Sequence, residues 1–433
     1  MKYEPNWNSL CARPTPQWFD DAKFGIFIHW GVYSVPSFSR IDAFSEWYMH
    51  QLDTEKMPEV VDFHKRVYGD RVSYRDLAAT WKAELYDPDR WAEIFQKSGA
   101  KYINITSKHH DGFCLYETPY AVNWNSVEIG PHRDLLMELK TALAKTDVKF
   151  GVYHSIYEWY HPLFVKDPEQ YALEHLHPMM KDLIERYEPW TLFTDGEWDF
   201  PAETWHSAEF LAWLLNESKV RDYIVPNDRW GKGTRGVYTC GNYTSEYDTI
   251  DGRKKRDFSS PDCFDKPFEE CRGIGKSFGF NRIEPLSNYM SAEALIKMFV
   301  DLVSKGSNFL LDVGPAGDGT IPVIMEERLL QIGEWLAVNG EGIYGTRPYT
   351  HTIGGEIKYT KKGDAVYAFV GRYPWGEIAL DEIPYTPDLK ASVLGCDAPV
   401  TVFEKGGKAA VSVPQVNPDE MKSKYVYTIK IET

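Results

Sequence analysis

Short runs of apolar, β-branched and aromatic residues alternate with amphipathic helical stretches along most of the chain. Buried strands that alternate with helices predict βα units around a parallel sheet. At least six such units favour a (β/α)8-like (TIM) barrel over a short doubly wound sheet. Strands are predicted at 23–30, 101–107, 148–155, 190–194, 222–226 and 308–313, and helices at 89–97, 134–145, 168–187, 202–218, 291–305 and 324–338.

Two regions depart from this pattern. Residues 248–287 are rich in charge, Gly and Pro, and we expect long loops or degenerate barrel units there. After Gly342 the segments become short, alternating and separated by turn residues, which predicts a small C-terminal antiparallel β-sandwich. The sequence therefore predicts a catalytic barrel domain over 1–345 and a β-sandwich domain over 346–433.

Composition narrows the class of protein. Of the 433 residues, 43% are hydrophobic and 15% aromatic, which is ample for a large core and excludes wholesale disorder. A net charge of −16 disfavours nucleic acid as a partner, because phosphate contacts dominate that affinity. No apolar run approaches the roughly 20 residues that span a membrane. The first residues lack a basic and an apolar signal region, so we expect a cytoplasmic enzyme with no membrane partner.

Candidate chemistry lies where the predicted strands end, because a βα barrel places its active site at the carboxyl ends of its strands. Four successive strands end in ionisable or aromatic groups: His29, the run 108–111, Tyr153 with His154, and the run 195–197. Asp195 follows an apolar strand and precedes Gly196, so its carboxylate can project from the barrel mouth. A helix N-cap is an equally good interpretation from position alone.

The clustered histidines admit three interpretations, and one is that they are structural residues packed in the barrel. Neutral imidazoles with a carboxylate can bind zinc, but the sequence contains no H-E-x-x-H motif and no His-x-His at the end of the first strand. Hydrogen bonding of a polyhydroxyl substrate accounts for them equally well.

Eight runs, in order along the chain, strongly resemble the α-L-fucosidases of glycoside hydrolase family 29, of the bacterial type. They are WFDDAKFGIFIHWGVYSVP (18–36), EWY (46–48), TSKHHDGFCLY (106–116), FGVYHS (150–155), TDGEW (194–198), NDRWG (227–231), GIGKSFGFNR (273–282) and NFLLDVGPAGDGTIP (308–322). The resemblance covers about residues 7–344, whereas the C-terminal part resembles that family's β-sandwich in pattern alone.

This resemblance implies a retaining, exo-acting hydrolase that removes terminal α-L-fucose through a covalent fucosyl-enzyme. Asp195 matches the family's nucleophile. Glu246 best matches the acid/base of bacterial relatives, and Glu269 is a competing carboxylate. Retention needs these two carboxyl groups about 5–5.5 Å apart.

The resemblance also implies the sugar pocket. His29, His109, His110, Tyr153 and Arg229 match positions that hydrogen-bond the sugar hydroxyls, Glu46 and Trp47 come from a loop, and Phe278 and Phe193 face the apolar side of the sugar. Phe193 replaces a tryptophan of some relatives, and Gly196 replaces a bulkier residue. No metal or other cofactor is implied.

The expected partner is a fucosylated oligosaccharide or glycoconjugate, and a homo-oligomer is left open. Two other hypotheses for the function stay open: a metal-dependent barrel hydrolase, and a catalytically silent fucose-binding protein.

Overall fold

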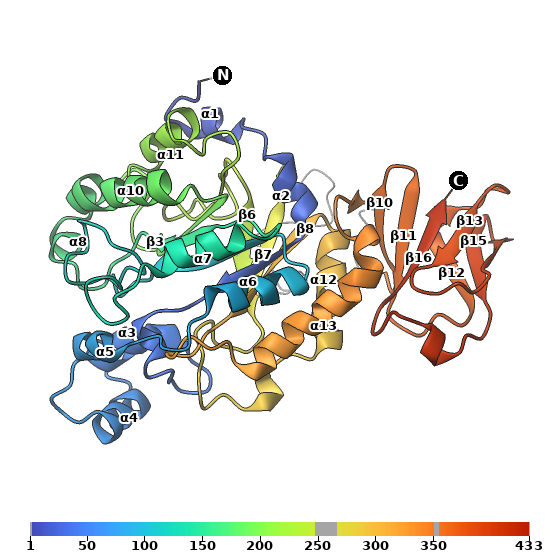
Figure 1. The fold of residues 1–433 in the computed structure, drawn as a ribbon. Coiled ribbons are helices and arrows are strands. Elements are labelled where there is room, and N and C mark those ends of the chain that lie inside the picture. Colours follow the sequence, from blue (N-terminus) through green and yellow to red (C-terminus); the bar gives the residue numbers. More distant parts are fainter. Residues whose placement is uncertain (1, 247–265, 350–354, 433) are drawn as a thin grey trace.

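The computed structural model describes residues 2–246, 266–349 and 355–432. Its larger part is built on an eight-stranded parallel sheet that curls into a barrel-like shape, in the strand order β5-β4-β3-β2-β1-β8-β7-β6 (Figure 1). The strands are β1 (Phe24–Ile28), β2 (Tyr102–Lys108), β3 (Val152–Ser155), β4 (Thr191–Asp195), β5 (Val225–Pro226), β6 (Tyr243–Glu246), β7 (Phe268–Gly273) and β8 (Ser307–Val313). The (β/α)8-like prediction is confirmed.

The two ends of this sheet approach each other between β5 and β6. These strands share no ladder, but the backbone N–H of Asn242 donates to the carbonyl of Pro226 at 3.2 Å. A Cβ on Gly241 would lie 2.0 Å from that same carbonyl oxygen, so only glycine permits the approach. One close backbone contact thus stands where a full barrel would have a ladder.

Helices cover the outer face of the sheet and bury their apolar stripes against it. α6, α7 and α12 each begin with a side-chain cap, from Asp87, Asp134 and Ser291 respectively. None of the helices in the described ranges has the length and apolarity to cross a membrane. The larger outer helices are α6 (Pro88–Lys97), α7 (Leu135–Leu143), α10 (His177–Tyr187), α11 (Ser207–Asn216), α12 (Ala292–Ser304) and α13 (Val323–Asn339).

Shorter helices occupy the connections and the N-terminal segment. They are α1 (Trp7–Cys11), α2 (Gln17–Ala22), α3 (Tyr48–Asp53), α4 (Pro58–Val67), α5 (Tyr74–Thr80), α8 (Pro162–Lys166) and α9 (Pro168–Tyr171). The single helix predicted over 168–187 is interrupted by a π-helical turn at Ala172–Leu176. Pro178 explains the interruption, because it lacks the N–H that a continuous α-helix requires.

The C-terminal part consists of two antiparallel sheets, which confirms the β-sandwich prediction. One sheet has the order β13-β16-β11-β10-β9 and the other β12-β15-β14. Their facing side chains form a separate apolar core that includes Leu380, Val411 and Ile429. The strands are β9 (Arg347–Pro348), β10 (Lys358–Lys362), β11 (Ala365–Val370), β12 (Gly376–Pro384), β13 (Lys390–Val393), β14 (Thr401–Lys405), β15 (Lys408–Val413) and β16 (Tyr427–Glu432).

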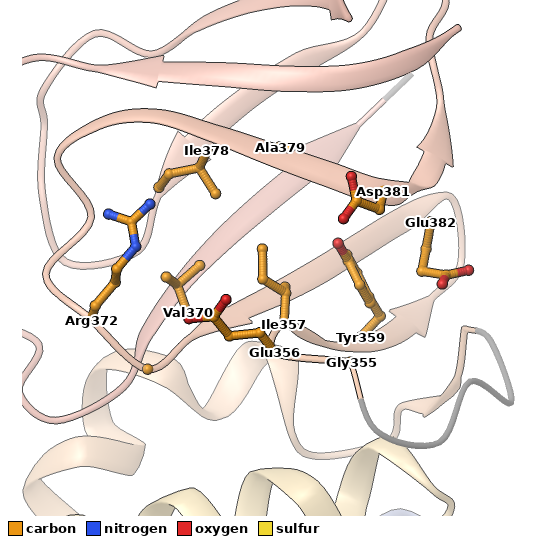
Figure 2. A pocket seen from close by; sticks show the side chains of 11 residues that line it. Gly355, Glu356, Ile357, Tyr359, Val370, Arg372, Ile378, Ala379, Asp381 and Glu382 are labelled. Carbon is orange, nitrogen blue, oxygen red and sulfur yellow. The ribbon is translucent and has the colours of Figure 1, made fainter. Parts of the chain in front are cut away.

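The β-sandwich packs beside α12 and α13 (Figure 1). The indole N–H of Trp335 donates to the carbonyl of Val426 at 2.7 Å, and Lys358 pairs with Asp301 at 2.8 Å. A cleft of about 230 Å³ opens at one end of the sandwich, between β10, β11 and β12 (Figure 2). α13 ends at Asn339 and β9 begins at Arg347, and the domain boundary at residue 345 stays a prediction.

The expected irregular region at 248–287 is only partly as predicted. Residues 247–265 lie outside the described ranges, but Phe268–Gly273 forms the regular strand β7, paired on both sides. The polar sequence FEECRG does not look like a buried strand. Glu269 and Glu270 are nevertheless both buried, because Glu269 is bonded to Tyr102 and Glu270 to Ser245. Tertiary hydrogen bonds therefore offset the cost of burying these two glutamates, whose polarity is otherwise typical of a loop.

Candidate active site

A pocket of about 240 Å³ opens at the carboxyl ends of the parallel strands. It is the place where the side chains predicted from the sequence converge. Of the twelve predicted site residues, the pocket brings together eleven, namely His29, Glu46, Trp47, His109, His110, Tyr153, Phe193, Asp195, Arg229, Glu246 and Phe278. Glu269 does not line it.

Asp195 is the last residue of β4 and lies deep in this pocket, with its side chain 13% exposed. Its Oδ1 accepts from Nη1 of Arg229 at 2.7 Å, and its Oδ2 accepts from the hydroxyl of Tyr153 at 3.2 Å. Nε2 of His110 lies 3.6 Å from the same Oδ2. Burial alone would raise the pKa of Asp195, but the positive charges of Arg229 and Arg235 hold that pKa below its usual range.

Gly196, which follows Asp195, is required by packing. Its φ is +87°, and a Cβ there would lie 2.4 Å from Cβ of Tyr157. A larger side chain does not fit this backbone, so the left-handed turn after β4 needs glycine.

Glu246, the last residue of β6, faces the same guanidinium group. Nη1 of Arg229 lies 3.0 Å from Oε2 of Glu246 and 2.7 Å from Oδ1 of Asp195. The sum of these two distances is the upper limit for the separation of the two carboxylate oxygens. That limit admits the spacing of about 5–5.5 Å found in retaining glycosidases. Glu246 is 31% exposed, so it lies at the mouth while Asp195 lies below it.

Glu269 lies in the barrel interior, away from this pair. It is 2% exposed and accepts from the hydroxyl of Tyr102 at 3.2 Å. Burial raises the pKa of Glu269 to about 8, so the group is protonated at neutral pH. Its neighbour Tyr102 belongs to an aromatic layer with Phe19 below the pocket.

Three histidines face the pocket in their neutral form. Burial lowers the pKa of His29 to about 3 and that of His110 to about 4, and it takes the pKa of His109 well below the usual range. Nδ1 of His29 shares a 2.6 Å hydrogen bond with Asp312, and Nδ1 of His110 shares one of 2.5 Å with Ser155. These partners orient the two rings.

Nδ1 of His109 is different, because it is buried and has no hydrogen-bond partner within the described residues. A buried polar atom of this kind is costly unless something binds it. Because Nδ1 has almost no exposed surface, His109 lines the pocket with another part of its ring.

Glu46 and Trp47 enter the pocket from the 3-10 helix Ser45–Trp47. Oε2 of Glu46 accepts from the backbone N–H of Gly279 at 2.8 Å, and burial raises the pKa of Glu46 to about 7 in spite of this bond. Phe278 stacks on His29 at 4.9 Å between ring centres, and Phe193 lies under the guanidinium of Arg229 at 4.7 Å. Polar donors and acceptors thus share the pocket with apolar walls.

Sequence reasoning missed several lining residues. Arg235 reaches the pocket from the loop after β5, and Phe44 and Trp198 stand at the mouth, 39% and 37% exposed. Asp312, which orients His29, lies just outside the lining. Arg235 belongs to no recognisable motif, whereas Trp198 could have been predicted as a pocket residue because it ends the TDGEW run.

One cluster of described residues has metal-ligand geometry, and it lies outside the pocket. The ligand atoms of Glu158, His161 and His175 are within 4.8 Å of one another. However, Oε2 of Glu158 already accepts from the buried ammonium of Lys108 at 3.1 Å and from the hydroxyl of Tyr171 at 3.0 Å. A metal cation would face that ammonium at close range, so the donor set fits an internal ion pair better.

The fold and the site together define a class of protein. A parallel βα barrel whose mouth pairs two carboxyl groups across a guanidinium, among hydrogen-bonding and apolar side chains, is typical of a glycoside hydrolase. The Alpha-L-fucosidase family model matches residues 1–341, and the Alpha-L-fucosidase C-terminal domain model matches residues 350–432. The chain belongs to the alpha-L-fucosidase family.

Relatives of known name agree with this assignment along the whole chain. The tissue alpha-L-fucosidase of Bos taurus is 38% identical over 445 residues, covering 99% of this chain and 91% of its own length. The plasma alpha-L-fucosidase of Homo sapiens is 42% identical over 390 residues, covering 86% and 79%. The structure of Thermotoga maritima alpha-fucosidase in complex with fucose has a TM-score of 0.83 and 32% identity, and the alignment covers all of both chains.

Proposed function

We propose that this protein is a retaining, exo-acting α-L-fucosidase that hydrolyses terminal α-L-fucosyl linkages of oligosaccharides or glycoconjugates. The observation that carries the proposal is the pair Asp195 and Glu246, held on either side of one nitrogen of Arg229. Membership of the alpha-L-fucosidase family supplies the sugar. The fucose found in the Thermotoga maritima structure supports the same choice.

In the first step Asp195 acts as nucleophile. Its carboxylate attacks the anomeric carbon, the bond from that carbon to the leaving oxygen breaks, and Glu246 gives its proton to that oxygen. The lowered pKa of Asp195 suits this role, because the nucleophile must be ionised.

In the second step Glu246 acts as base. It removes a proton from water, the water oxygen bonds to the anomeric carbon, and the ester to Asp195 breaks. The exposure of Glu246 at the mouth suits this step, because the leaving group must depart and water must enter from that side.

Recognition of the sugar is assigned to the rest of the pocket. His29, His109, His110 and Glu46 supply donors and acceptors for hydroxyl groups. Phe278 supplies an apolar wall, which suits the methyl group of a 6-deoxy sugar.

Placement within the bacterial type of the family is a further proposal. The full-length match to the Thermotoga maritima structure supports it, although mammalian relatives reach 38–42% identity. Turnover of simple aryl α-L-fucosides would be expected of a broad-acting enzyme.

The proposal is tested by incubation with 2-deoxy-2-fluoro-α-L-fucosyl fluoride and peptide mass mapping. We expect a covalent fluorofucosyl adduct on Asp195. An adduct on another residue would keep the retaining mechanism but contradict the nucleophile. Absence of both an adduct and turnover of an aryl α-L-fucoside would contradict the proposed activity.

A further inference from the structure

Arg235 occupies a central position among the carboxylates of the pocket. Its Nε donates to Oε1 of Glu197 at 2.8 Å, and its Nη2 lies 2.8 Å from the same oxygen. Nη2 also lies 3.6 Å from Oδ1 of Asp195, and Nη1 lies 3.7 Å from Oε2 of Glu246. One guanidinium group therefore faces the proposed nucleophile, the proposed acid/base and a third carboxylate.

The loop that carries Arg235 is fixed on both sides of the side chain. The backbone N–H of Gly236 donates to Oδ2 of Asp228 at 2.6 Å, and the hydroxyl of Thr234 donates to the carbonyl of Asp228 at 2.8 Å. Asp228 is buried and also accepts from Thr244 at 2.7 Å. The backbone beside Arg235 is therefore held in place, and the contact with Glu197 orients its guanidinium, although the side chain is 33% exposed.

Of the three carboxylates that face Arg235, Glu197 lies closest to its guanidinium. It is 4% exposed, although it lies only two residues after Asp195, and among the residues that the structure describes Arg235 is the cation with which it forms an ion pair. Burial raises the pKa of Glu197, and Arg235 opposes that rise. The positive charge of Arg235 therefore favours the ionised form of Glu197.

The charge balance of the cluster creates a difficulty for a general acid. Two guanidinium groups lie within 4 Å of Glu246, and positive charge at this range stabilises a carboxylate anion in general. A general acid must instead hold its proton until the leaving group takes it. A carboxylate that offsets one of the two positive charges would relieve this conflict.

We propose that Glu197 is a positioning residue whose negative charge offsets that of Arg235, so that Glu246 keeps its proton in the first step of the reaction. This inference rests on the proposed function and deepens it. Glu197 touches neither reacting carboxylate in this arrangement, and it acts through Arg235.

Other charged or titratable groups also face this cluster, and they stay in place in the test. Within the described ranges, groups that act on Glu246, Asp195 or Glu197 come from every neighbouring element: Arg229 after β5, Cys271 on β7, Glu46 on the 3-10 helix, His29 after β1, His110 after β2 and Tyr153 on β3.

The experiment measures kcat/KM of an aryl α-L-fucoside from about pH 4 to about pH 9. Its alkaline limb reports the loss of the proton from the acid of the free enzyme. In Glu197→Gln the charge of Arg235 is no longer offset, so we expect this limb to move to lower pH by roughly one unit. Arg235→Met should move the limb to higher pH, and the double variant should return it toward the wild-type position.

Two controls separate charge from structure. Glu197→Asp keeps the charge, and its alkaline limb should stay near that of the wild type even if kcat falls. Glu203→Gln removes an exposed carboxylate from the same connection outside the pocket and should leave the limb in place.

A limb that stays in place in Glu197→Gln, or one that moves equally in the double variant, would overturn the inference. If Glu197→Gln does not fold, the direction of the shift in Arg235→Met decides instead, and a shift to lower pH would overturn it. Lack of any turnover by the wild type would contradict the proposed function itself, so the two failures are distinguishable.

Discussion

Two cavities of nearly equal volume occur in this molecule, and they differ in how their polar groups are held. The barrel pocket is about 240 Å³ and the sandwich cleft about 230 Å³. In the barrel pocket, Arg229, His110 and Glu46 are almost fully buried and bonded to other elements. In the cleft, Arg372 and Asp381 are exposed, and the buried lining consists of Tyr359 and aliphatic residues (Figure 2).

The difference teaches that volume alone does not identify an active site. Strands of a parallel barrel all end at one rim, so side chains from many elements converge there. The cleft lies between two sheets that were brought together to bury Ile378 and Val370, and its charges belong to the surrounding surface. Converging buried ionisable groups distinguish the barrel pocket.

The largest effect is expected from Asp195→Ala. Loss of the nucleophile should lower kcat by several orders of magnitude, because no covalent intermediate can form, and external azide should restore part of the rate. The measurement is kcat with an aryl α-L-fucoside, alongside the thermal midpoint. Full activity in this variant would remove the distinction between the two cavities.

Glu246→Gln should have the next largest effect. We expect kcat/KM to fall by about 10²- to 10⁴-fold for a substrate with a poor leaving group, and much less for an activated aryl fucoside that leaves without a proton. A series of leaving groups measures this dependence. Equal losses across the series would contradict the acid/base assignment.

Glu269→Gln should change stability and leave catalysis nearly intact. The pKa of Glu269 is about 8 in the folded protein against about 4.3 in an unfolded chain, so the folded state binds the proton more tightly. Its contribution to the free energy of unfolding is full below about pH 4 and is lost as pH rises to about 8. The Gln variant should flatten this part of the profile, measured by denaturant unfolding at several pH values.

This variant also discriminates between the two acid/base candidates. If Glu269→Gln lost activity in proportion to leaving-group basicity, Glu269 would be the acid/base in place of Glu246.

The smallest effect is expected in the sandwich cleft. Asp381→Ala is a matched control for Asp195→Ala, because it removes an aspartate from a cavity of similar volume. We expect kcat/KM to change less than about twofold and the free energy of unfolding to change by about 0.5 kcal/mol or less. A large loss of activity would show that the cleft takes part in the function.

The sequence determined the alternation of strands and helices and the change to an antiparallel part, and its resemblance to a known family indicated most of the pocket residues. Buried strands are short apolar runs, and their polar ends mark the rim, so Asp195 and His29 could be placed without coordinates. The strand at 268–273 was not predicted, because its glutamates are hydrogen-bonded to Tyr102 and Ser245, which are remote in sequence.

Only the tertiary structure decided which carboxylate accompanies Asp195. Glu246 and Glu269 both lie at barrel strands, but one ends its strand at the mouth and the other points into the interior beside Tyr102. Arg235 and Asp312 were likewise identified only from the tertiary structure, Arg235 as the partner of Glu197 and Asp312 as the partner of His29. Local sequence sets which residues form a strand, whereas the roles of charged side chains depend on the neighbours that folding brings within a few ångströms of them.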